Sequence, residues 1–193
     1  MKKEKLITIL GPTASGKTEL GVYLAKKLGS SVISGDAFQV YKGMDIGTAK
    51  VTPEEAQGVT HYLVDDLDAT EPYSAAIFQE KAKFYITEEN KKGKIPILVG
   101  GTGLYIQGLL EGYTFLPEVK KSGKWHSLYQ EKGKVALLEQ LSGKVATEKI
   151  PRDPQRMIRQ LGLIEEGYSL ESSKSGELPV SYTHLRAHET LRY

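Results

Sequence analysis

The feature that most constrains this chain is an eight-residue stretch at positions 11–18, which reads Gly-Pro-Thr-Ala-Ser-Gly-Lys-Thr. It matches the pattern G-x-x-x-x-G-K-[ST], which forms a phosphate-binding loop when a buried strand precedes it and a helix follows. Residues 6–10 are a short β-branched apolar run, typical of a buried strand. From residue 16 to 28 apolar side chains recur at helical spacing, and Gly29 is placed to end that helix. The sequence therefore predicts a strand, a phosphate loop and a helix in succession.

Each part of the loop has a physical task. Glycines let backbone N–H groups curl around phosphate oxygens, and the start of the helix adds unpaired donors and the positive end of its dipole. The Lys17 ammonium would neutralise phosphate charge, and the Thr18 hydroxyl would help to hold Mg²⁺. A purely structural glycine turn is the alternative. The predicted diphosphate- or nucleotide-binding residues are Gly11, Pro12, Thr13, Ala14, Ser15, Gly16, Lys17 and Thr18.

Three further strand candidates follow, at residues 32–33, 61–64 and 95–99, and residues 73–90 show helical periodicity between the last two. Strands separated by helices pair in parallel through right-handed crossovers. We therefore predict an α/β fold, a P-loop NTPase-like parallel sheet flanked by helices, over residues 1–113.

Beyond Gly112 the chain becomes charged and helix-prone, notably at residues 134–141 and 154–166. Asp153 and Pro154 supply an N-cap and a first-turn proline for the second of these helices. Residues 114–171 are therefore predicted to form a small helical appendage. Residues 172–193 are polar and aperiodic, and we expect a disordered or non-native tail there.

Composition excludes several classes of protein. There is no cysteine, hence no disulfide and no thiolate metal site. The apolar runs are too short to span a bilayer, so we expect a cytoplasmic monomer without a membrane partner. The formal net charge is only +2, but residues 118–160 hold ten Lys or Arg against five acids. That excess suits a nucleic-acid contact, although a merely solvated face explains it as well.

Two other segments end predicted strands on the same edge of the sheet as the loop, where parallel α/β sheets bind ligands. Asp36 follows the second strand, and its carboxylate could reach a ligand of the loop or merely cap a turn. Gly100-Gly101-Thr102-Gly103 follows the fourth strand and places small residues and one hydroxyl beside the same crevice. A tight turn and a helix cap at Thr102 explain that segment equally well.

Together these segments resemble the tRNA dimethylallyltransferase, or IPP transferase, family. The resemblance covers most of the chain from residue 6 to about residue 159. The shared signatures begin with G-P-T-A-S-G-K-T at 11–18 and continue with S-G-D-A-F-Q-V-Y-K-G-M-D-I-G-T-A-K at 34–50, Y-S-A-A-I-F at 73–78, L-V-G-G-T-G-L-Y at 98–105 and D-P-Q-R at 153–156.

The resemblance implies transfer of a dimethylallyl group from dimethylallyl diphosphate to the exocyclic amine of the adenine 3′ of the anticodon in tRNA. It implies that the loop holds the diphosphate with Mg²⁺ near Thr18, that Asp36 accepts a proton from the amine, and that Thr102 lies close to the target base. Asp36, Thr18 and Thr102 are thus the catalytic candidates. The implied tRNA contacts are Asp36, Ala37, Phe38, Gln39, Thr102, Arg156, Met157, Ile158, Arg159 and Gln160.

The chain also departs from the family pattern. Position 37 is Ala where the family usually has Ser, the helical insertion before Asp153 is short, and the family's further C-terminal section is missing. We therefore expect a truncated chain that keeps donor binding but has weak or no transferase activity. The alternatives are an adenylate isopentenyltransferase, a P-loop kinase of small metabolites, and an inactive phosphate- or RNA-binding fragment.

Overall fold

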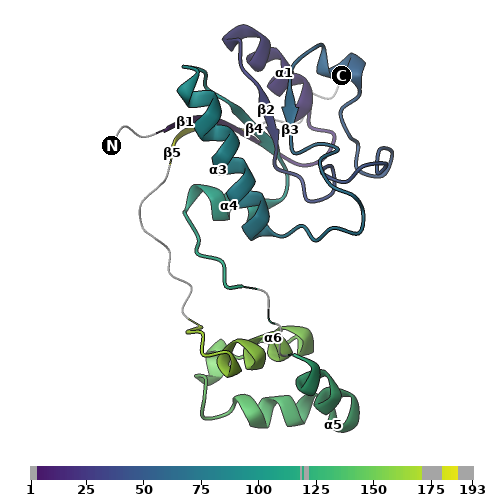
Figure 1. Cartoon of the computed structure of the whole chain (residues 1–193), viewed down its shortest axis with the longest axis vertical. Coiled ribbons are helices and arrows are strands. Elements are labelled where there is room, and N and C mark those ends of the chain that lie inside the picture. The colour runs from purple at the N-terminus through teal and green to yellow at the C-terminus, as the bar shows by residue number, and fades with distance from the viewer. Residues whose placement is uncertain (1–3, 118, 120–121, 171–179, 187–193) are drawn as a thin grey trace. The chain divides into compact units, whose positions relative to one another are not determined.

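The computed structural model describes residues 4–117, 119, 122–170 and 180–186 (Figure 1). These residues fall into two compact units, each with its own core. The first unit contains residues 4–114 and 180–186, and the second contains residues 115–170.

A five-stranded parallel sheet is the centre of the first unit, which confirms the predicted α/β class. Its order is β3-β2-β4-β1-β5, so the strand that precedes the phosphate loop lies next to β4 and one strand away from β2. The strands are β1 (Glu4–Leu10), β2 (Val32–Ser34), β3 (His61–Tyr62), β4 (Ile97–Gly100) and β5 (Val180–Arg186).

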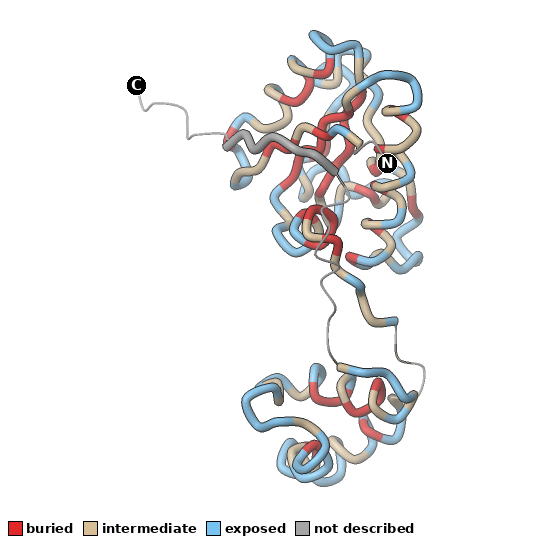
Figure 2. Tube along the Cα trace, turned by 90° about the vertical axis from the view of Figure 1, so that its left-hand side faces the viewer, coloured by how far each residue is buried: buried red, intermediate tan, exposed pale blue. Residues whose placement is uncertain are grey.

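Helices cover both faces of the sheet because its strands are apolar on both sides (Figures 1 and 2). On β4, Leu98 packs against one helical layer, whereas Ile97 and Val99 pack against the other. The first layer contains α3 (Ala75–Lys91) and α4 (Gly103–Leu110), and the second contains α1 (Lys17–Leu28). A short helix, α2 (Pro53–Ala56), precedes β3. Within the described part of the chain, no helix combines the length and the apolarity needed to cross a membrane.

The predicted strands and helices of this unit are confirmed, although the ends of several of them differ by one or two residues. The strand predicted at 61–64 ends at Tyr62, because Leu63 and Asp65 adopt left-handed backbone angles, with φ of 62° and 54°. Gly29 ends α1 in the left-handed conformation, as predicted. The helix predicted at 73–90 begins at Ala75, where the Ser74 hydroxyl accepts a hydrogen bond from the Ile77 amide.

Strand β5 differs from the expectation of an irregular tail. Residues 180–186 pair in parallel with β1, from Glu4 opposite Val180 to Leu10 opposite Arg186. Backbone hydrogen bonds to the edge of β1 form this ladder, and they need no apolar pattern that a sequence could reveal. The prediction of disorder is therefore wrong for these seven residues, while residues 172–179 and 187–193 lie outside the described residues.

The second unit is helical, as predicted. It contains α5 (Gly123–Leu141), a 3₁₀ turn η1 (Thr147–Lys149) and α6 (Pro154–Glu165). Helix α5 begins well before the predicted residue 134 and is kinked at Gly133, where φ is 72°. The Asp153 side chain accepts a hydrogen bond from the Arg156 amide at 2.9 Å, which confirms the predicted cap of α6. Trp125, Leu137, Leu141, Met157, Ile158 and Leu161 form the core of this unit.

Candidate active site at the carboxyl ends of the strands

The loop at residues 11–18 has the concave backbone expected of an anion site. Ala14 and Gly16 are left-handed, with φ of 62° and 78°, so the intervening amides turn toward one side. The Ser15 hydroxyl donates to the Pro12 carbonyl at 2.8 Å, and the Lys17 ammonium donates to the same oxygen. Helix α1 then begins at Lys17 and presents its unpaired first-turn N–H groups to the loop.

Lys17 and Asp36 lie on the same edge of the sheet, as the sequence predicts. Partial burial lowers the pKa of the Lys17 ammonium, and the Asp36 carboxylate raises it, with a net lowering. Thr13 of the same loop and Asp36 line one cavity, so the loop and the carboxylate face a common space. A cationic phosphate loop and a carboxylate therefore share one site.

Glycines allow the three strand ends to meet so closely. The Gly35 amide donates to the Val99 carbonyl at 2.7 Å. A Cβ at Gly100 would stand 2.5 Å from the Gly35 carbonyl oxygen, and one at Gly101 would stand 3.3 Å from the Gly11 oxygen. No side chain fits at Gly100 without a backbone shift, so packing alone requires a glycine at the end of β4.

The Asp36 carboxylate is oriented by its own loop. Its Oδ1 atom accepts hydrogen bonds from the amides of Phe38 at 2.8 Å and Gln39 at 3.3 Å. These bonds cap a turn, which is the alternative role that the sequence allows for Asp36. They engage only Oδ1, and no described residue donates a hydrogen bond to Oδ2. The partly exposed carboxylate therefore keeps one oxygen that can accept a proton from a ligand.

Two cavities open at this edge. One of about 610 Å³ is lined by Thr13, Asp36, Phe38 and residues 43–49. The other, of about 330 Å³, lies against the start of the phosphate loop and α4, and Gly11, Gly101, Ile106 and Leu110 are among its lining residues. The first cavity is therefore a cleft with the candidate proton acceptor in its wall.

Thr102 is placed at the N-cap position of α4, but its side chain makes no capping hydrogen bond. The residue is half-buried. Thr18 stands in the first turn of α1 and is likewise half-buried. No group of three or more His, Asp or Glu side chains able to hold a metal occurs among the described residues. A cation at this site would therefore depend on hydroxyl and phosphate oxygens together with water, a ligand set that Mg²⁺ accepts.

Residues 156–160, which are predicted to contact tRNA, include both exposed and buried side chains. Arg156 and Arg159 are exposed on α6, and Arg159 donates to the Leu116 carbonyl at 3.1 Å. Met157 and Ile158 are each only 1% exposed and pack in the core of the second unit. These two side chains hold α6 in place, and a contact of Met157 and Ile158 with RNA stays a prediction. On an amphipathic helix, any five consecutive residues include some that face the core and some that face solvent.

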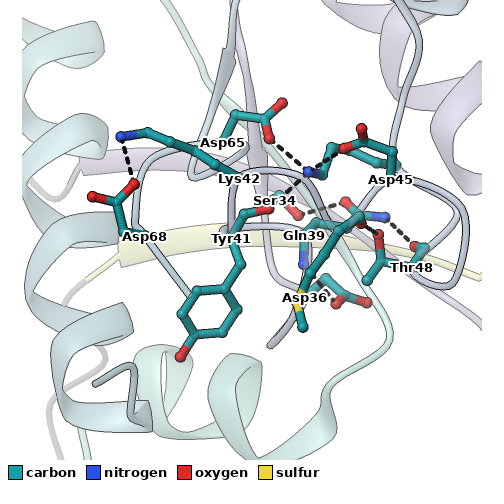
Figure 3. A network of polar contacts seen from close by, with 11 residues as sticks. Ser34, Asp36, Gln39, Tyr41, Lys42, Asp45, Thr48, Asp65 and Asp68 are labelled. Atoms are coloured by element: carbon teal, nitrogen blue, oxygen red, sulfur yellow. Dashed lines mark hydrogen bonds and ion pairs between the residues drawn. The ribbon is translucent and has the colours of Figure 1, made fainter. Parts of the chain in front are cut away.

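Lys50 is a buried residue that sequence reasoning missed. Its partners Asp45, Asp65 and Tyr41 are labelled in Figure 3. Its ammonium donates to Asp45 Oδ1 at 2.7 Å, to Asp65 Oδ1 at 2.6 Å and to the Tyr41 carbonyl at 2.8 Å. The sequence signal was present, since Asp45 and Lys50 both lie in the long signature at 34–50. The partner Asp65 could not be assigned, because it comes from a different loop.

Comparison with known proteins identifies the family. A model of the IPP transferase family matches residues 39–190, well over half of the chain. The chain belongs to the IPP transferase family. Among curated members, the tRNA dimethylallyltransferase of Staphylococcus carnosus is 56% identical over 140 residues, which cover 72% of this chain and 43% of that protein. That of Carboxydothermus hydrogenoformans is 49% identical over 84% of this chain and 54% of its own length.

Solved members of the IPP transferase family have the same fold. The full-length tRNA isopentenylpyrophosphate transferase of Bacillus halodurans superposes with a TM-score of 0.61 at 40% identity, over 95% of this chain and 60% of that one. A eukaryotic dimethylallyltransferase acting on tRNA gives a TM-score of 0.75 at 28% identity, over 95% of this chain and 48% of that one. The chain thus spans only 43% and 54% of the lengths of the two curated relatives named above.

Proposed function

We propose that this chain binds dimethylallyl diphosphate at residues 11–18 and transfers the dimethylallyl group to the exocyclic amine of the adenine 3′ of the anticodon in tRNA. Pyrophosphate is the second product. The observation that carries the proposal is that Thr13 of the phosphate loop and the Asp36 carboxylate line one cavity at the edge of the sheet. The names of the relatives, tRNA dimethylallyltransferase and tRNA isopentenylpyrophosphate transferase, support the same reaction.

The loop would bind the diphosphate of the donor. Residues 11–18 supply amide donors, and Lys17 supplies a positive charge. An allylic carbon–oxygen bond breaks readily once the charge on the departing diphosphate is neutralised. The loop therefore supplies both affinity for the donor and stabilisation of its leaving group.

Mg²⁺ fits the same place. The Thr18 hydroxyl is the residue that would hold it, with the remaining ligands coming from diphosphate oxygens and water. When bound, the cation would neutralise further charge on the leaving group.

Asp36 would serve the acceptor. As the amine nitrogen bonds to the allylic carbon, the carbon–oxygen bond to diphosphate breaks and the nitrogen must lose a proton. The Asp36 Oδ2 atom, to which no described residue donates, can accept that proton, while Oδ1 remains fixed by two amides. We further propose that the uncapped Thr102 hydroxyl lies close to the target base.

The tRNA contacts proposed for Asp36 and Phe38 follow from their place in the lining of the cleft, and those for Ala37 and Gln39 from their position beside these two residues in the chain. The contacts proposed for Arg156, Arg159 and Gln160 follow from their position on α6. The two exposed arginines suit phosphate contacts, whose strength would fall with increasing salt concentration.

The test is a transfer assay with unmodified tRNA and radiolabelled dimethylallyl diphosphate. We expect labelled tRNA from the parent chain, and a loss of about 10²- to 10⁴-fold in transfer for Asp36→Asn, with pyrophosphate binding retained. Asp68→Asn is the matched control, because Asp68 is an exposed carboxylate paired with Lys42 and is not a lining residue of the cleft. Transfer by Asp36→Asn at the parental rate would remove Asp36 from the mechanism.

A further inference from the structure

The outer wall of the cleft, residues 43–49, displays apolar side chains to solvent. Ile46 is 98% exposed and Met44 is 43% exposed, and Phe38 on the adjoining segment is 61% exposed. All three line the cleft that contains Asp36. Single exposed apolar residues are ordinary, but three around one cavity indicate a contact surface. The transfer mechanism makes no use of Met44 or Ile46.

This wall is anchored at Lys50, at the end of the segment. The Lys50 side chain is 4% exposed and holds Asp45 from the wall, Asp65 from another loop and the Tyr41 carbonyl (Figure 3). A lysine that buries its stem to bind three oxygens fixes the backbone around it. The apolar side chains are therefore presented from a held loop.

Gln39 also anchors the wall. Its side-chain amide donates to the carbonyls of Thr48 at 3.1 Å and Ala49 at 3.2 Å (Figure 3). Its side-chain oxygen accepts from the Ser34 hydroxyl at 2.9 Å, and its backbone amide binds Asp36 Oδ1. One residue thus connects the wall to the carboxylate, so the positions of Asp36 and of the apolar side chains depend on each other.

The charge of the lining indicates which part of an RNA it fits. Asp36 and Asp45 are acidic, and none of the lining residues is Lys or Arg. Such a surface repels phosphate groups and anionic membranes, whereas it offers apolar contact to the uncharged face of an unstacked base. Proteins that recognise single-stranded RNA splay bases out in this way.

We propose that Met44 and Ile46 form a platform for an unpaired nucleobase adjacent to the target adenine. This inference rests on the proposed function, because the adenine must reach Asp36 for its neighbour to reach the wall. Extruding a base from a stacked loop costs a few kcal/mol. Contact of the neighbouring base with Met44 and Ile46 offsets part of that cost and selects loops whose bases are free to unstack.

The test measures binding of fluorescent hairpin RNAs whose loop contains the target adenine. One hairpin is intact, and two others lack the base on the 5′ or the 3′ side of the target. The Met44→Ser/Ile46→Ser variant should bind the intact hairpin at least about 5-fold more weakly than the parent chain, the factor that corresponds to about 1 kcal/mol of lost apolar burial. It should bind one of the abasic hairpins as well as the parent chain does. Leu28→Ser, an exposed leucine at the far end of α1, is the matched control.

Each outcome decides the question. Equal loss on all three hairpins, or no loss on any, overturns the platform while leaving the transfer reaction intact. If the parent chain shows no preference for the hairpin loop over duplex RNA, the proposed function fails and the platform fails with it. If the wall instead binds an apolar protein partner, the Met44→Ser/Ile46→Ser variant should lose that association while its RNA binding is unchanged. This outcome also overturns the inference.

Discussion

The Asp36 carboxylate favours the charged form of the Lys17 ammonium, while partial burial of Lys17 disfavours it by a larger amount. The two groups come from the segments that follow different strands, β1 and β2, and they share one edge of the sheet, where β4 alone separates those strands. A partly buried lysine ammonium binds an anion more readily than a fully solvated one, because it has already lost part of its hydration. It is also more sensitive to pH.

The first prediction concerns this balance. Asp36→Asn removes the charge that raises the pKa of Lys17, so burial alone remains and the pKa falls further below its ordinary value of 10.5. Pyrophosphate binding, measured by titration calorimetry from about pH 7 to pH 10, should then weaken at a lower pH than in the parent chain. Asp68→Asn should leave the pH profile unchanged. An unchanged profile in Asp36→Asn would show that the two groups are not coupled.

A second prediction tests the close approach of strand ends. Gly100→Ala places a Cβ 2.5 Å from the Gly35 carbonyl oxygen and must displace backbone. We expect a loss of about 1–3 kcal/mol in the free energy of unfolding, measured by urea denaturation, together with weaker pyrophosphate binding. Gly103→Ala is the matched control, because nothing lies within 4 Å of its added Cβ. Equal stability of the two variants would contradict the geometry.

Much of this architecture could be predicted from the sequence, because its signals are local. Neighbouring residues alone determine the strand before the loop, the glycine that ends α1 and the Asp153 cap. The early end of β3 could not be predicted, because a leucine gives no indication of the left-handed backbone angle that Leu63 adopts. The pairing of β5 with β1 joins segments more than 170 residues apart.

The site was predictable to a similar degree. The common position of Lys17 and Asp36 could be predicted because the edge of a parallel sheet gathers the residues that follow its strands, while their roles stay predictions. The roles of Lys50 and Gln39 depend on contacts with Asp65 and with the carbonyls at 48 and 49, which only the folded loops bring together. Met157 and Ile158 were assigned to RNA from a motif, whereas the periodicity of their own helix points to the core.

A third prediction concerns the buried lysine. Lys50→Met removes hydrogen bonds to Tyr41, Asp45 and Asp65, and should cost about 1–3 kcal/mol in the free energy of unfolding. Hydrogen exchange in residues 43–49 should become faster. Lys42→Met, which removes an ion pair between two exposed side chains, should cost less than about 1 kcal/mol. Similar exchange in both variants would mean that Lys50 does not hold the wall.

A fourth prediction is a pH dependence at Glu89, whose side chain is 3% exposed. Burial alone would raise its pKa, but hydrogen bonds from Lys92 at 2.8 Å and Tyr62 at 3.2 Å reverse this, so that the pKa is lowered. A carboxylate with a lowered pKa stabilises the fold above its unfolded pKa of about 4.5 and loses that contribution as the pH falls.

Glu89→Gln should therefore be less stable than the parent at pH 7, by about 1–3 kcal/mol, and the difference should shrink below about pH 4. Urea denaturation across this range measures it. Glu80→Gln is the control, since Glu80 is an exposed carboxylate on the same helix, and little change is expected there. A difference that grows toward low pH would reverse the assigned direction of the shift.

The last prediction uses Trp125, the only tryptophan in the chain, as a reporter of the helical unit. Its indole donates to Glu165 at 2.9 Å, and it packs in a core with Leu141 that shares no residue with the cores of the sheet unit. Leu141→Ala should cost about 2–5 kcal/mol and shift Trp125 emission, while pyrophosphate binding at residues 11–18 is retained. Val135→Ala, 64% exposed on the same helix, should change neither. Loss of pyrophosphate binding in Leu141→Ala would show that the two cores fold as one cooperative unit.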